Sequence, residues 1–182
     1  MLLWKNQSMG SESQTGFDCS VCGKRHDVLP VSYSVKAPQA VTAIPPDEFS
    51  QRVVITPDQC VINGKDFYLR GRIVIPVIGL DKPFVWGVWA EISPKNFIRA
   101  NDLWTVPGRE NEPAFPGWLN TEIPIFGNTI NLEVSVNTQP VGQRPHFMVS
   151  DPVHPLAIEQ REGISLQRVE ELAEMMLHPG QD

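Results

Sequence analysis

Residues 59–78 read QCVINGKDFYLRGRIVIPVI, and the class of fold follows from this stretch. The pair Asn63-Gly64 predicts a tight hairpin, because both central residues of a type I′ turn need a positive φ. β-Branched and aromatic residues on both sides of the turn are typical of strands. In the return strand, Gly71 predicts a bulge or bend, and Pro76 places the strand's end at a sheet edge. The stretch therefore predicts an antiparallel strand pair.

Other segments extend this pair into a sheet. We expect further strands over residues 52–56, 84–92, 129–136 and 145–150. Along 84–92 side chains alternate between faces, so Trp86 and Trp89 must point in opposite directions. The apolar residues of 129–136 occupy every second position, which indicates one buried face. Residues 105–128 are rich in Pro and Gly and predict a long loop.

Helices follow the strands along the chain. Ser93 before Pro94 predicts a capped helix that ends near Trp104, and Ser165 caps a C-terminal helix. That last helix carries one apolar stripe, formed by Leu166, Val169, Leu172, Ala173, Met176 and Leu177. Pro-Pro-Asp-Glu at 45–48 begins one short helix. Without βαβ alternation, this order predicts an α+β fold with a mostly antiparallel sheet and a C-terminal amphipathic helix.

Composition limits both domain organisation and partners. The 182 residues are 41% hydrophobic, which is enough for one sizeable core. We expect a flexible leader over 1–16, a small unit over 17–30 and a single α+β domain over 31–182. A net charge of −6 with no basic block argues against binding to nucleic acid or anionic membranes. With no transmembrane stretch and no signal peptide, we expect a cytoplasmic protein.

The sharpest chemical signal is Cys19-Ser-Val-Cys22-Gly23, with His26 four residues further on. Two thiolates at this spacing can hold one tetrahedral ion, and glycine after the second lets the backbone turn around it. Sulfur and nitrogen donors favour zinc. The sequence thus predicts an N-terminal zinc knuckle with Cys19, Cys22 and His26 as ligands. Cys60 is the remaining thiol and the candidate for a fourth ligand.

Two other interpretations of the cysteines stay open. A redox dithiol would need the Cys-x-x-Cys at a helix N-terminus, which the polar run after Gly23 does not favour. Alternatively the pair is unligated, and Cys60 is a small core residue. If a metal is bound, its role is expected to be structural.

A polar segment near the C-terminus offers the main catalytic candidates. His154 precedes a predicted helix that carries Glu159, and a histidine beside a carboxylate suits general acid–base catalysis. No nucleophile accompanies them, so capping by His154 and ion pairing by Glu159 explain the pattern more simply. Gln160 and Arg161 in the same segment are candidate binding residues.

Candidate binding residues also occur on the strands. Trp86 belongs to an aromatic-rich region, 84–118, that suits either a ligand groove or a core. Arg70, Arg72 and Arg144 lie on or near strands and are suited to an anion, although an exposed sheet face would account for them equally well.

Taken together, the motifs form a recognisable series. In chain order they are Phe17-x-Cys19-x-x-Cys22-Gly-Lys-x-His26, Asp58-Gln-Cys60, Arg70-Gly71, Ile75-Pro76-Val77, Trp86-Gly87-Val88-Trp89, Asn96-Phe97, Gly117-Trp118-Leu119, Gly142-x-Arg144-Pro145 and His154-Pro-Leu-Ala-x-Glu159-Gln160-Arg161-x-Gly163-Ile164. This series resembles the uncharacterised bacterial family called domain of unknown function 2199, over about residues 17–178. The resemblance implies that these motifs belong together, and it carries no activity and no catalytic residue.

From these patterns we expect a zinc-stabilised module that binds a protein or a small molecule. One alternative is a small hydrolase that uses His154 and Glu159. Another is a protein that neutralises a toxin, which only the acidic net charge supports.

Overall fold

A computed structural model describes residues 4–6 and 16–180 of the chain. Its strands are β1 (Lys5–Asn6), β2 (Phe17–Asp18), β3 (Arg25–His26), β4 (Ser32–Ser34), β5 (Val53–Ile55), β6 (Gln59–Ile62), β7 (Asp66–Ile75), β8 (Phe84–Ile92), β9 (Phe115–Leu119), β10 (Glu133–Asn137) and β11 (His146–Val149). Its α-helices are α1 (Phe49–Arg52), α2 (Pro94–Asp102), α3 (Pro155–Glu162) and α4 (Leu166–Leu177). Short 3₁₀ helices cover Gln39–Ala43, Arg109–Asn111 and Pro124–Phe126. The α+β class is confirmed.

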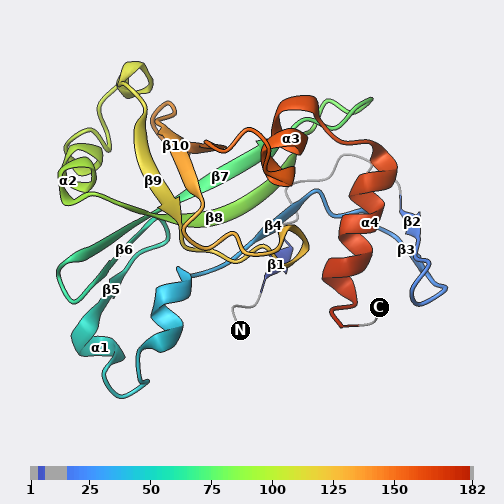
Figure 1. Cartoon of the computed structure of the whole chain (residues 1–182), viewed down its shortest axis with the longest axis horizontal. Coiled ribbons are helices and arrows are strands. Elements are labelled where there is room, and N and C mark those ends of the chain that lie inside the picture. The colour runs from blue at the N-terminus through green and yellow to red at the C-terminus, as the bar shows by residue number, and fades with distance from the viewer. Residues whose placement is uncertain (1–3, 7–15, 181–182) are drawn as a thin grey trace.

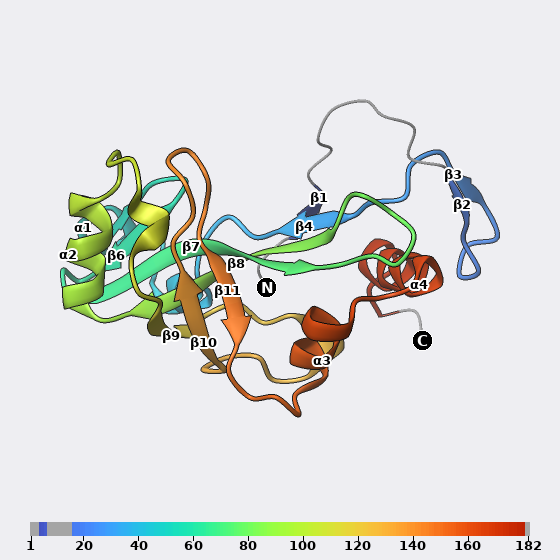
Figure 2. The ribbon, with the colours of Figure 1, turned by 90° about the horizontal axis from the view of Figure 1, so that it is seen from above.

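The centre of the fold is a closed barrel of five strands (Figure 1 and Figure 2). From β7 to β11, each strand pairs with the next in antiparallel fashion, and β11 then pairs with β7 to close the barrel. An odd number of alternating strands leaves the first and last running in the same direction. Closure between β11 and β7 is accordingly parallel, through His146 and Arg72.

The two longest strands also carry strands outside the barrel. β7 pairs with β6, which continues to β5, and β8 pairs with β4, which continues to β1. The first half of β8 lies beside β4 in parallel, whereas its second half lies beside β9. The predicted leader lies largely outside the described residues, but within it Lys5–Asn6 form β1.

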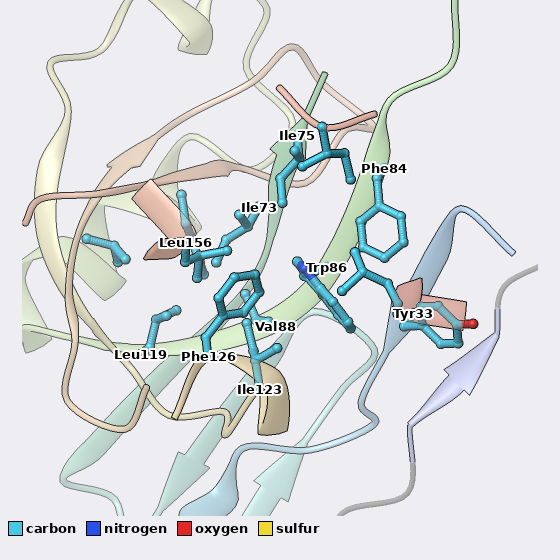
Figure 3. Packing of buried hydrophobic residues seen from close by; sticks show 14 of the residues in the cluster. Tyr33, Ile73, Ile75, Phe84, Trp86, Val88, Leu119, Ile123, Phe126 and Leu156 are labelled. Carbon is cyan, nitrogen blue, oxygen red and sulfur yellow. The ribbon is translucent and has the colours of Figure 1, made fainter. Parts of the chain in front are cut away.

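The main hydrophobic core includes the inward-facing residues of the barrel and extends beyond it to residues of β4 and α4. Figure 3 shows Trp86 in its middle, with Val88 and Phe126 on one side and Phe84 and Tyr33 on the other. Trp89, the other tryptophan of β8, belongs to a second cluster on the opposite face of the sheet. The predicted alternation along this strand is therefore confirmed, and both faces of β8 are buried.

Several local predictions are confirmed. Asn63 and Gly64 have φ values of 53° and 66° and turn the chain from β6 into β7. The hydroxyl oxygens of Ser93 and Ser165 accept backbone N–H groups and cap α2 and α4.

Other local predictions are wrong. Residues 105–128 are not only loop, since they contain β9. The strand predicted over 129–136 begins at Glu133, because Asn131 has a φ of 63° and turns the chain just before it. The predicted bulge at Gly71 is absent, because pairing of β7 with β8 runs through this residue without a break.

Candidate functional site

The N-terminal knuckle is a small hairpin made by β2 and β3. The backbone N–H groups of Cys19 and Gly23 donate to the carbonyl oxygens of Lys24 and Cys19, both at 2.9 Å, and close a tight turn. Gly23 has a φ of 66°, as the turn after the second cysteine requires. His26 follows on β3, where its ring stacks on that of Phe17. Local structure thus brings three predicted ligands to one end of the hairpin.

Helix α4 lies against this knuckle (Figure 1 and Figure 2). The carboxylate of Glu174 accepts hydrogen bonds from the backbone N–H and the hydroxyl of Ser20, the latter at 2.8 Å. These bonds lower the pKa of Glu174. Because His178 follows Glu174 by about one helical turn, it lies on the same side of the helix end, close to the knuckle.

Four side chains from these two segments form a candidate metal centre. One ligand atom from each of Cys19, Cys22, His26 and His178 lies within 4.8 Å of all the others. The Cys22 Sγ and His26 Nε2 atoms are 3.5 Å apart. Metal–ligand bonds of about 2.0–2.3 Å in a tetrahedron place ligand atoms at about this separation.

The surroundings also suit a metal ion. The Cys19 side chain is buried, and the Nε2 atom of His178 is buried with no hydrogen-bond partner among the described residues. A buried polar nitrogen without a partner is costly, and coordination to a metal would satisfy it. The four residues therefore fit a closed Cys₂His₂ site.

The structure brings Cys19, Cys22 and His26 together as predicted, but Cys60 does not join them. Cys60 lies on β6, fully buried in the second hydrophobic cluster beside Trp89 and Tyr68. The structure therefore does not bring Cys60 to this group, and His178 is the fourth member of the cluster. Sequence spacing offered no signal for His178, since the fold alone brings the C-terminal helix beside the knuckle.

The two catalytic candidates, His154 and Glu159, each have a structural partner. The Nδ1 atom of His154 accepts the backbone N–H of Leu156 at 3.2 Å and caps α3. Glu159 accepts a hydrogen bond from the Arg168 guanidinium at 2.9 Å. These contacts match the simpler interpretation of the segment, capping by His154 and ion pairing by Glu159.

The other candidate binding residues lie in different places. Trp86 is fully buried in the main hydrophobic core. Gln160 is also buried. Its side-chain amide accepts a hydrogen bond from the Val149 N–H and donates one to the Phe147 carbonyl, and these bonds connect α3 to β11. Arg161 is exposed and pairs with the adjacent Glu162.

Arg144 differs from them because it lines a cavity. Its Nε donates to the Asp58 carboxylate at 2.6 Å, and both residues line a pocket of about 650 Å³. Arg72 lines the same pocket. Two of the three arginines that the sequence singled out for anion binding therefore share one cavity.

Comparisons with known proteins identify a family. Residues 18–164 match the model of a family described as an uncharacterised protein conserved in bacteria, DUF2199. The matched region includes three members of the candidate metal centre and ends before His178. Searches of curated proteins and of solved structures gave no match.

Proposed function

The chain belongs to the uncharacterised bacterial family DUF2199, and we propose that it is a zinc-stabilised binding module. The observation that carries this proposal is the convergence of Cys19, Cys22, His26 and His178. Two thiolates and two imidazoles form a soft donor set, which favours zinc over harder ions.

A structural role for the ion follows from the number of protein ligands. A catalytic zinc usually has three protein ligands and keeps one position open for water or substrate. Four protein ligands leave no such position. An ion held here would join the N-terminal knuckle to the C-terminal end of α4, and its binding free energy would add to the stability of the fold.

Binding rather than catalysis is supported by what surrounds the polar groups. His154 and Glu159 are engaged in capping and ion pairing, whereas the pocket near Arg144 is open to a ligand. A cytoplasmic location belongs to the same proposal, because reduced thiols stay available for metal there. Among the described residues, no helix is long and apolar enough to cross a membrane.

The proposal is tested by metal content and thermal unfolding of protein purified without chelator. We expect one zinc per chain in the unaltered protein and much less in Cys19→Ser and His178→Gln. Because a structural ion contributes several kcal/mol, the melting temperature should fall by about 5–10 °C in both variants. Cys60→Ser is the matched control, since it removes a buried thiol that lies outside the centre.

Cys60→Ser should keep its zinc even if loss of core packing lowers its stability. Unaltered protein without metal would contradict the proposal. Full zinc content in His178→Gln would contradict the four-residue site and the link to α4.

A further inference from the structure

A second site lies on the outer surface of the barrel, where β4 pairs with β8. Its cavity of about 650 Å³ is lined on the sheet by Ser32, Ser34, Gly87 and Arg72. Arg72 and Gly87 are direct partners across β7 and β8. Because side chains alternate along a strand, they face away from the core residues Ile73 and Trp86. Cavities that bind small molecules typically have about this volume.

Positive charge dominates this cavity, although the chain as a whole carries a net charge of −6. Arg72, Arg144 and Arg109 line it, and Asp58 is the one carboxylate among its lining residues. That carboxylate is bound to the Arg144 guanidinium at 2.6 Å. An excess of positive charge therefore remains.

The Arg72 guanidinium is the most significant part of this excess. The side chain is half-buried, and no hydrogen bond or ion pair to it occurs within residues 4–6 and 16–180. Burial, and then repulsion from Arg144, lower its pKa. Arg144 also adds to the effect of burial on the neighbouring Arg70, whose pKa is lowered too. A partly buried cation without a counter-charge is unfavourable. An anion between Arg72 and Arg144 would relieve the repulsion of these two side chains.

The wall of the cavity is held in place by Arg109. Its guanidinium is buried and donates to the carbonyl oxygens of Trp104, Gln139, Pro140 and Gln143 at 2.7–3.2 Å. It also lies over the Trp104 ring, 5.3 Å from the ring centroid. These contacts fix Trp104 and the loop that leads to Arg144 before any ligand binds. A site organised in advance loses less entropy on binding.

We propose that this cavity binds a small-molecule phosphate monoester, with the phosphate between Arg72 and Arg144 and the organic body against Trp104 and Val85. Arginine pairs with phosphate through two parallel hydrogen bonds. Asp58 accepts only from the Nε of Arg144, and no described residue accepts from the Arg72 guanidinium, so a phosphate can bind the remaining nitrogens of both side chains. The volume and the aromatic and aliphatic lining leave room for an apolar or planar body. This inference rests on the proposed role as a binding module, but it does not depend on the metal.

Isothermal titration calorimetry with phenyl phosphate tests the inference, with inorganic phosphate and phenol as the partial ligands. We expect phenyl phosphate to bind more tightly than inorganic phosphate, and phenol not to bind. Arg72→Gln should weaken binding of phenyl phosphate at least tenfold, which is about 1.4 kcal/mol. This variant removes no hydrogen bond among the described residues, so it should remain folded, and its melting temperature checks that.

Arg161→Gln is the matched control, because it removes one positive charge from an exposed site that does not line the cavity. Unchanged binding in this control, together with weakened binding in Arg72→Gln, would support the inference. Equal weakening in both variants would overturn it, since general charge attraction would then explain the binding. No binding of phenyl phosphate, or binding no tighter than that of inorganic phosphate, would overturn it as well.

Metal content measured on the same samples separates this result from the proposed zinc role. Protein that lacks zinc but binds phenyl phosphate would contradict the metal centre and leave the phosphate site supported. Protein with one zinc that does not bind the probe would overturn the phosphate site alone.

Discussion

A missing side chain at Gly71 allows the Phe147 ring to lie inside the barrel. A Cβ atom placed on Gly71 would approach the ring of Phe147, with atoms only 2.3–2.7 Å away. Phe147 is fully buried and belongs to the main core. The glycine is thus required by Phe147 on the neighbouring strand β11, and the pairing of β7 with β8 is unbroken at this residue.

Replacement of Gly71 by alanine should therefore destabilise the protein. We expect Gly71→Ala to reduce the free energy of unfolding by about 1–3 kcal/mol, because overpacking forces core side chains to move. Urea denaturation measures this loss. In a double-mutant cycle, Phe147→Leu should make the glycine substitution less costly. Additive effects of the two substitutions would contradict the proposed contact.

Cys60 differs from the other two cysteines in its chemistry. The side chain is fully buried, and burial raises the pKa of its thiol to about 11. Only the thiolate is nucleophilic, so Cys60 should react very slowly near neutral pH.

Alkylation followed by mass spectrometry checks this expectation. In the native protein Cys60 should remain unmodified by iodoacetamide, both with and without chelator, and it should react once the chain is denatured. Cys22 should become modified in the native protein after a chelator has removed the metal. Rapid modification of Cys60 in the native state would show that its cluster is not a closed core.

At the scale of elements, Gln160 joins α3 to β11. The amide bonds the N–H of Val149 and the carbonyl of Phe147, at 3.0 and 2.7 Å, on the outer edge of the last barrel strand. Because β11 has only four residues, these two hydrogen bonds are a large share of the hydrogen bonds that its backbone makes on this side. One side chain of α3 thus makes the backbone hydrogen bonds that a neighbouring strand would otherwise make.

Gln160→Ala should leave these two backbone groups without partners. The expected loss is about 1–3 kcal/mol in the free energy of unfolding, as for other buried polar groups that lose a partner. Gln167→Ala on the exposed surface of α4 is the control and should change stability by less than about 0.5 kcal/mol. Thermal or urea unfolding of both variants makes the comparison, and equal effects would contradict the role of Gln160.

At the scale of the whole molecule, the candidate metal centre connects segments from opposite ends of the chain. The knuckle and α4 are joined by the four candidate ligands and by the Ser20–Glu174 hydrogen bonds. The barrel strands are held by their own ladders and core. Loss of the ion should therefore affect both end segments together and leave the barrel intact.

Hydrogen exchange with and without chelator measures this coupling. We expect exchange to increase over 17–30 and over 166–178 in parallel, with little change in β7 to β10. An increase confined to the knuckle would mean that α4 is held without the metal. An equal increase of exchange in the barrel strands would mean that the ion stabilises the whole domain as one unit.

Some features of the fold could be predicted from the sequence, and others could not. The Asn63-Gly64 turn, the caps at Ser93 and Ser165 and the opposite faces of Trp86 and Trp89 all depend on residues close together in the chain. Closure of the barrel could not be predicted, because the pairing of β11 with β7 involves one parallel contact between distant segments. The strand at β9 was missed since its Pro and Gly residues are typical of loops, and tertiary pairing overcame that preference.

The candidate sites divide in the same way. Cysteine spacing was enough to predict Cys19, Cys22 and His26 as a group, because ligands in one tight turn are close whatever the rest of the chain does. His178, the exclusion of Cys60, and the meeting of Arg72 with Arg144 in one cavity were decided by the tertiary structure. Those residues are far apart in the chain, so their proximity depends on how the barrel closes and where α4 packs.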